Sequence, residues 1–433
     1  MKLNKCTAII RHQLDQSPIF LALWAGTFSF ISYLCMYMVR KPFTAGTFSD
    51  QSYWGIDLKI WLIIAQVLGY ALSKFIGIRV ISTLNPKRRL LFFCLLMVLA
   101  TSSLGIYYLV PLPYAIVFFF LNGIPLGMIW GIVFSYLEGR KITEVLTAVL
   151  SSNFIISSGF AKSLGSYLVA SGIDENAMPF FCAMLFLPIA MVSFYLLSLT
   201  PAPDNKDQLL RVERKPMNKK DRKWIIKKHG IALLLFTLTY VFLTIIRDIR
   251  DNFAVEIWSA TGVHNNRSIY TLTELPVAII LLIGLALIYR IKNNDTALKT
   301  IYTMMFFCIG ILLVSTYLFD SGYLNPTFWM IVSGSALFIP YILFNGILFD
   351  RYIASFKING NTGFFMYTAD AFGYLASAFI MLSKNITDAS ADWLSYYIKI
   401  SYAGGVILNV VLCITLLHLY HKLKNKETIV SFT

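Results

Sequence analysis

Two arginines end apolar stretches of matching design. YLCMYMVR ends at Arg40, and YVFLTIIR ends at Arg247. An aromatic or hydroxyl side chain stands seven and three residues before each arginine, on the helix face that the arginine shares. These residues are candidate substrate-binding residues that would complete a polar lining: Tyr33, Tyr37, Tyr240 and Thr244. A guanidinium group can bind carboxylate or phosphate oxygens through two parallel hydrogen bonds, so the pattern predicts an anion clamp whose halves are Arg40 and Arg247.

Two alternatives to the clamp stay open. Each arginine comes late in its apolar stretch, so each could instead extend its charge to the nearest membrane interface. Asp248 and Asp251 stand close to Arg247 and Arg250 along the helix, and such pairs would leave less charge for an anion. The matched register of the two halves favours the clamp. A charge in mid-membrane costs about 3 to more than 10 kcal/mol, so such a residue normally faces a cavity or a partner.

Further charges lie inside other apolar stretches. Lys74, in YALSKFIG, shares a helix face with Gln66 and Tyr70 and either lines a cavity or extends to the interface. We expect Lys162, in GFAKSLGS, to extend to the outer interface.

Two acidic residues are embedded as well. Asp370, in YTADAFGYL, is interpreted equally as a proton site, a counter-ion for an arginine, or part of a buried pair that fixes packing. Glu274 precedes Pro276 and marks either a kinked gate or a structural position at the interface, and it is counted with Asp370 as a candidate for a proton site or an ion pair.

Composition places these charges in a membrane. Of 433 residues, 57% are hydrophobic and only 14% are charged, against about 25% in soluble domains. The net charge of +15 lies largely between apolar stretches, so it orients helices and does not indicate nucleic acid. The cysteines lack metal or redox spacing. No phosphate-binding loop, HExxH motif or nucleophile elbow occurs, so we expect no enzyme, cofactor or metal.

Twelve stretches approach the roughly 20 apolar residues that a membrane span needs. They cover 19–41, 58–82, 89–110, 113–137, 143–170, 177–199, 230–255, 268–290, 299–319, 326–349, 361–383 and 393–420. The polar, strongly basic stretch 200–229 divides them, which predicts an N-terminal bundle over 1–199, a cytoplasmic linker, and a C-terminal bundle over 230–433. Gly123, Gly127 and Gly131 predict close helix packing.

Loop charges predict orientation. The N-terminus, the connections after the second, fourth and tenth spans, and the C-terminal tail are basic, while connections on the other side are short or acidic. Because cytoplasmic loops are enriched in Lys and Arg, we expect both termini in the cytoplasm.

The chain resembles the major facilitator superfamily, and within it the organophosphate:phosphate antiporters. The resemblance covers both halves and rests on YMVRKPF (37–43), GYALSKFIG (69–77), GIPLGMIWG (123–131), YVFLTIIR (240–247) and FGYLAS (372–377). It implies two pseudo-symmetric six-helix bundles and alternating access. It also implies a central cavity in which Arg40 and Arg247 bind phosphate and Lys74 adds positive potential.

The chain departs from that family at three positions. Pro42 stands where the family has Asn, Asn153 lies near the place of a family His, and Asp370 adds a negative charge. We count Asn153 among the candidate binding residues. These departures leave open the substrate and the mode of exchange.

The sequence thus predicts a secondary transporter of a small organic or phosphorylated anion, with phosphate or protons as the coupling ion. Two alternatives stay open: a receptor that kept the cavity but not transport, and a proton-coupled symporter of a neutral or zwitterionic solute. We expect a monomer in the lipid bilayer, and the resemblance implies the bacterial inner membrane.

Overall fold

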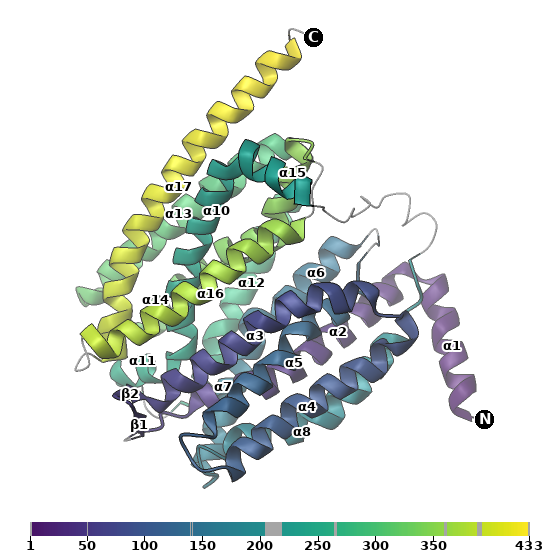
Figure 1. Cartoon of the computed structure of the whole chain (residues 1–433), viewed down its shortest axis with the longest axis vertical. Coiled ribbons are helices and arrows are strands. Elements are labelled where there is room, and N and C mark those ends of the chain that lie inside the picture. Colours follow the sequence, from purple (N-terminus) through teal and green to yellow (C-terminus); the bar gives the residue numbers. More distant parts are fainter. Residues whose placement is uncertain are drawn as a thin grey trace. The chain divides into compact units, whose positions relative to one another are not determined.

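The computed structural model of the chain describes residues 2–49, 51–138, 140, 142–203, 219–263, 266–358, 362–387 and 392–431. The chain divides into two compact units, and Figure 1 shows their elements. Unit 1 comprises Met1–Val212 and Arg267–Thr271, and unit 2 comprises Glu213–Asn266 and Leu272–Thr433. Of the predicted linker over 200–229, residues 204–218 lie outside the described residues.

Unit 1 is helical apart from one small hairpin. Its helices are α1 (Lys2–Gln16), α2 (Pro18–Arg40), α3 (Leu58–Thr83), α4 (Arg89–Leu109), α5 (Ile116–Phe134), α6 (Thr143–Ser151), α7 (Asn153–Ala170) and α8 (Met178–Ser198), with short 3₁₀ turns at Pro42–Ala45 and Pro86–Arg88. Strands β1 (Ser52–Tyr53) and β2 (Ile56–Asp57) pair antiparallel. Helix α3 packs against α5, and α8 packs against α2 and α4 (Figure 1).

Unit 2 is also helical in its described residues. Its elements are α10 (Lys219–Asn252), α11 (Ala254–Ala260), α12 (Ile269–Tyr289, whose first turn belongs to unit 1), α13 (Asn294–Asp320), α14 (Pro326–Leu343), a π-helical turn (Phe344–Leu348), α15 (Phe349–Ser355), α16 (Thr362–Thr387) and α17 (Trp393–Ser431). Helix α10 packs against α14, α16 and α17, and α13 packs against α14 and α17.

The helices have the length and composition of membrane spans. Within the described residues, ten helical segments are long and apolar enough to cross a membrane. The other two predicted spans, 58–82 and 361–383, form α3 and α16, each 26 residues long. A helix of that length extends about 39 Å, more than the roughly 30 Å of a hydrocarbon core. The prediction of an all-α, multi-pass integral membrane protein is confirmed.

The polar stretches before the two halves differ from expectation. Helix α10 begins at Lys219, so residues 219–229 are helical and do not belong to a linker that ends at 229. Their sequence, KKDRKWIIKKH, has no Pro or Gly and is rich in Lys, a good helix former. Residues 2–16, outside the predicted spans, form α1. Ser17 then caps α2 by accepting a hydrogen bond from the Phe20 N–H at 3.2 Å.

Two predicted spans are interrupted. The span over 143–170 breaks at Ser152, where the Ser152 hydroxyl donates to the Val149 carbonyl at 2.7 Å and the Asn153 amide donates to the Leu150 carbonyl at 3.1 Å. Such side-chain bonds compete with the helix ladder. The span over 326–349 contains Pro340 and passes into the π-helical turn after Leu343. Proline removes a backbone donor, and π turns interrupt helices at such places.

The predicted close packing at the glycines is confirmed for Gly123 and Gly127. A Cβ atom at Gly127 would lie 2.6 Å from the Ser73 hydroxyl and 2.7 Å from the Tyr70 carbonyl oxygen, both on α3. A Cβ at Gly123 would collide with the Gln66 carbonyl. The glycines therefore set the distance between α5 and the segment of α3 that carries Gln66, Tyr70 and Lys74.

We predict that Gly127→Ala destabilises the protein by about 1–3 kcal/mol, because the added methyl group must push α3 away. The measurement is the thermal unfolding of the purified full chain in detergent. Gly310→Ala in α13 is the control, since a Cβ there meets nothing within 4 Å. Equal unfolding temperatures for the two variants would contradict the packing argument.

Candidate functional site

Arg40 and Lys74 share one aromatic ring in unit 1. The Arg40 guanidinium carbon lies 4.1 Å from the centre of the Tyr70 ring, and the Lys74 ammonium lies 5.2 Å from it. Cations are attracted to the negative face of an aromatic ring, and this attraction is stronger away from water. Two of the predicted anion-binding residues are therefore brought together, with Tyr70 holding both.

A buried amide network fixes the end of α2 beside α3. The Gln66 amide donates to the Arg40 carbonyl at 3.0 Å and to the Asn122 side-chain carbonyl at 2.8 Å. Asn122 in turn donates to the Ala100 carbonyl at 2.9 Å. Because Gln66, Tyr70 and Lys74 are four residues apart on α3, one helix face supplies both the anchor of Arg40 and the ring beneath it.

The predicted aromatic residues of α2 are buried inside unit 1. Tyr33 is fully buried and Tyr37 is 4% exposed, with ring centres 5.6 Å apart in an edge-to-face contact. The Tyr33 ring also contacts Trp130 and Phe154 edge-to-face, at 5.1 and 6.2 Å. Sequence reasoning missed both partners, because a single aromatic residue in an apolar helix carries no signal of its own.

Arg247 in unit 2 repeats the stacking but has an acidic partner. Its guanidinium carbon lies 3.8 Å from the centre of the Tyr341 ring. Its Nε donates to Asp248 Oδ1 at 3.1 Å, and its Nη2 is bonded to the same oxygen. Asp248 Oδ2 accepts a hydrogen bond from Ser377 at 2.8 Å. This pair joins adjacent residues of α10, at a different spacing from the three or four residues expected of a helical ion pair.

Arg250 and Glu274 form a separate buried ion pair. Arg250 Nη1 donates to Glu274 Oε1 at 2.8 Å, and Nη2 donates to the Met330 carbonyl at 2.9 Å. The guanidinium group lies directly against Gly334, where a Cβ would be 2.5 Å from Nη2. Arg250 therefore ties α10 to α12 and α14.

Asp370 lies at the interface of α16 and α10. Its side chain is 2% exposed, and Oδ1 accepts a hydrogen bond from the Tyr240 hydroxyl. The Tyr240 hydroxyl is also hydrogen-bonded to that of Tyr341, at 3.0 Å, so Asp370 connects to the tyrosine beneath Arg247. Thr244 is buried one turn after Tyr240, where its hydroxyl would lie 3.0 Å from a Cβ at Gly373.

Two polar residues of α7 make local bonds. Asn153 is buried and accepts a hydrogen bond from Ser157 at 2.5 Å. Lys162 is only 2% exposed and donates to the Ser158 hydroxyl at 2.9 Å. The expectation that Lys162 extends to the interface is therefore wrong, because a serine one turn earlier offers an acceptor inside the unit.

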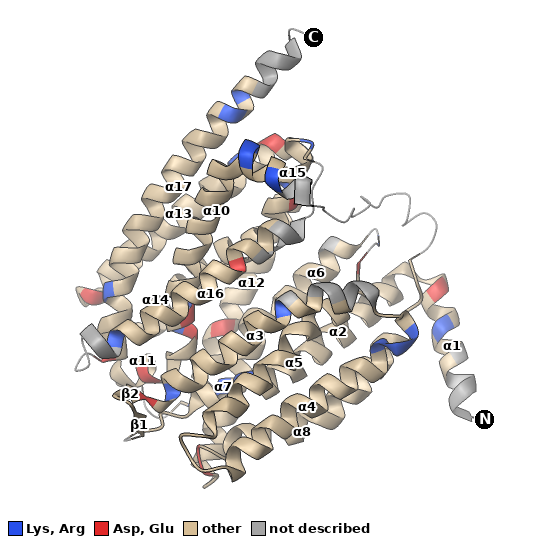
Figure 2. Ribbon diagram, viewed as in Figure 1, with Lys and Arg blue, Asp and Glu red and all other residues tan. Residues whose placement is uncertain are grey.

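The two units differ in the sign of their embedded charge (Figure 2). In the first half, residues 16–49, 58–137 and 145–173 contain no Asp or Glu, although they include Arg40, Lys74 and Lys162. In unit 2, Arg247 pairs with Asp248, and Arg250 pairs with Glu274. Its buried acidic side chains include Asp248, Glu274 and Asp370.

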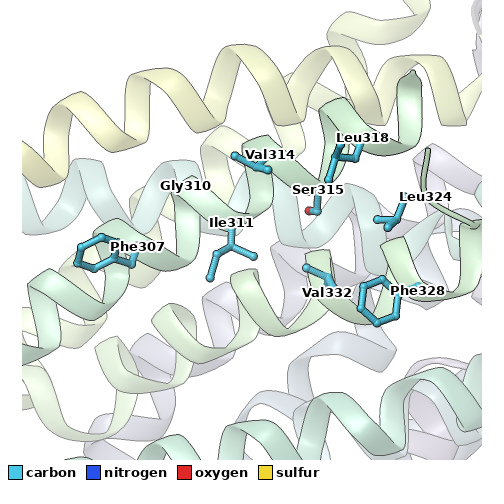
Figure 3. A pocket seen from close by; sticks show the side chains of 9 residues that line it. All are labelled: Phe307, Gly310, Ile311, Val314, Ser315, Leu318, Leu324, Phe328 and Val332. Atoms are coloured by element: carbon cyan, nitrogen blue, oxygen red, sulfur yellow. The ribbon is translucent and has the colours of Figure 1, made fainter. Parts of the chain in front are cut away.

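A pocket of about 410 Å³ lies between α13 and α14, away from these charges (Figure 3). Its lining is Phe307, Gly310, Ile311, Val314, Ser315, Leu318, Leu324, Phe328 and Val332. The one polar side chain, Ser315, donates to the Leu312 carbonyl at 3.1 Å. The pocket therefore offers no group that would bind an anion.

The fold is that of known membrane transporters. The nucleoside transporter NupG superposes with a TM-score of 0.63 at 13% identity, covering 91% of this chain and 98% of that one. The D-xylose-proton symporter gives 0.57 at 13% identity, with 93% and 98% covered. The human organic anion transporter MFSD10 (TETRAN) gives 0.57 at 14% identity, with 93% and 100% covered. These likenesses show the major facilitator fold predicted from the sequence.

Sequence comparison identifies the family. No curated protein matches the chain. A family match spans residues 42–424 and so includes Lys74, Arg247 and Asp370, while Arg40 lies just before it. The chain belongs to DUF5690, a family of unknown function.

Proposed function

We propose that the chain is a secondary transporter that moves a small organic or phosphorylated anion by alternating access. The proposal rests on one observation above all. Each unit places an arginine late in a membrane span, with its guanidinium plane held on a tyrosine ring. Stacking occupies the face of the guanidinium and leaves its N–H edge directed away from the ring, where a carboxylate or phosphate can bind.

The embedded charge of unit 1 supports an anion in particular. Arg40 and Lys74 lie on one ring, in a half whose residues 16–49, 58–137 and 145–173 contain no Asp or Glu. Two like charges near one another in a low-dielectric region repel, and a bound anion relieves that repulsion. A cationic solute would instead be repelled by both side chains.

In unit 2 an anion would compete with Asp248. The bonds to Asp248 use Nε and Nη2 of Arg247, and Ser377 holds the other carboxylate oxygen. We therefore propose that Arg40 and Lys74 are the main anion-binding residues, and that Arg247 binds the same anion after its bond to Asp248 weakens. Tyr33, Tyr37, Tyr240, Thr244 and Asn153 support these groups as positioning residues.

Proton coupling is a second candidate, favoured by Asp370. A buried carboxyl group that is hydrogen-bonded to Tyr240, and through it to the tyrosine beneath Arg247, can pass a change of charge to the arginine. Protonation of Asp370 would neutralise the carboxylate that accepts the Tyr240 hydrogen bond. Tyr240 and Tyr341 could then shift relative to Arg247.

We predict that Arg40→Lys and Arg247→Lys each weaken binding of inorganic phosphate and glycerol 3-phosphate about tenfold or more, because lysine lacks the planar fork. The measurement is titration calorimetry on the purified full chain. The double variant should lose less than the sum of the single losses if both arginines bind one anion.

Arg89→Lys is the matched control for this prediction. Its guanidinium also lies over a tyrosine, 5.4 Å from the Tyr136 ring, at the start of α4. If the two candidate arginines behaved like Arg89, extension to the interface would be the better explanation for them. Counterflow of radiolabelled glycerol 3-phosphate in proteoliposomes separates a transporter from a receptor, which would bind the anion without moving it.

We predict that Asp370→Asn abolishes uptake of glycerol 3-phosphate driven by a pH gradient and spares its counterflow, because asparagine accepts the Tyr240 bond but carries no titratable proton. Asp320→Asn, at the exposed end of α13, is the control. Equal loss of both activities in Asp370→Asn would indicate a structural role. If the pH gradient did not change the rate of uptake by the unsubstituted protein, exchange against phosphate would be the better mechanism than proton coupling.

A further inference from the structure

We propose that unit 1 holds an aromatic subsite beside Arg40, and that the transported anion carries a planar ring. The inference rests on the proposed function, because it assigns a substrate class to the same site. The subsite consists of Phe134, Trp130 and Phe154, named here the aromatic row.

The aromatic row is a set of nearly parallel rings. The Trp130 and Phe154 ring centres are 5.0 Å apart with planes 23° apart, and Trp130 and Phe134 are 6.3 Å apart with planes 6° apart. All three side chains are half-buried, so each keeps part of its surface open. A flat ligand ring can extend such a row by offset stacking.

Tyr33 fixes the row from the side. Its buried ring contacts both Trp130 and Phe154 edge-to-face, which favours their parallel arrangement. The row therefore combines a rigid support from α2 with open ring surface on α5 and α7, and rigid aromatic side chains lose little entropy on binding.

Trp130 is half-buried, and its indole N–H is not among the buried side-chain atoms that lack a partner, so it lies at the open surface of the unit. By contrast, Trp24 donates to the Leu196 carbonyl at 2.9 Å and Trp61 donates to the Tyr53 carbonyl at 3.0 Å. An indole N–H inside a membrane span cannot turn to bulk water, so an acceptor on a ligand would satisfy it. Packing alone explains a stacked ring but gives this donor no acceptor.

The aromatic row and the cations belong to one region of unit 1. Trp130 follows Gly127 on α5 by three residues, and Gly127 packs directly against Tyr70 and Ser73 of α3, next to Lys74. Tyr33 and Arg40 are seven residues apart on α2, or about 10 Å along the helix axis, and the long arginine side chain can shorten that separation. A ligand whose ring is joined to its anionic group directly or by a short linker, such as an aryl phosphate or an arylalkyl carboxylate, fits this shortened separation.

The test compares anions that differ by a ring. Binding of phenyl phosphate and inorganic phosphate, and of 3-phenylpropionate and propionate, is measured by calorimetry on the purified full chain. We expect the aryl member of at least one pair to bind several-fold more tightly. The pair that shows the difference identifies phosphate or carboxylate as the anionic group.

Substitution then assigns the preference to the aromatic row. We expect Trp130→Leu to reduce the ratio of aryl to ringless affinity about three- to tenfold, and Trp130→Phe to restore most of the stacking but not the N–H bond. Trp24→Leu, a half-buried tryptophan on α2 whose N–H already has a partner, is the matched control and should keep the wild-type preference.

Each outcome decides one of the two proposals. Suppose that phosphate or propionate binds and that Arg40→Lys weakens this binding, but that the aryl anions bind no more tightly. The aromatic subsite is then contradicted, while the proposal of an anion transporter is not. The same holds if Trp130→Leu and Trp24→Leu have equal effects. If none of the four anions binds the wild-type chain, the anion proposal fails and the subsite falls with it.

Discussion

The constraint on which this structure depends is that a guanidinium group within a membrane span must be stabilised without bulk water. Arg40 and Arg247 meet it through the face of a tyrosine ring, and Arg250 meets it through a carboxylate and a backbone carbonyl. Arg247 also bonds to Asp248, its neighbour on α10, whereas the bonds of Arg250 reach α12 and α14 and hold helices together. Two arginines three residues apart on one helix are therefore stabilised by different partners.

The matching stretches around Arg40 and Arg247 hide a difference between the units. Arg40 stacks on Tyr70 of α3, the second long helix of unit 1, whereas Arg247 stacks on Tyr341 of α14. Unit 2 also buries Asp248, Glu274 and Asp370, whereas residues 16–49, 58–137 and 145–173 of unit 1 contain no Asp or Glu. Two halves of similar design therefore differ in the charge of the side chains embedded in them.

The sequence predicted the helical, membrane-spanning class well, because about twenty apolar residues in a row have few other structures available. It also predicted the glycine contacts of α5, since a small residue every fourth position leaves one helix face flat. It did not predict the break at Ser152 or the early start of α10, which depend on local hydrogen bonds and on helix propensity in a polar stretch. Nor did it find Trp130 and Phe154, because their importance arises only from the neighbours that folding gives them.

The bonds of Arg250 have a mechanical consequence. One side chain joins α10 to the Glu274 carboxylate of α12 and to the Met330 carbonyl of α14, so these three helices resist sliding past one another at that level. Farther along α14, the π-helical turn at Phe344–Leu348 breaks the regular ladder. Bending of α14 is therefore concentrated after Tyr341, and the segment that carries the ring beneath Arg247 stays clamped at one end and compliant at the other.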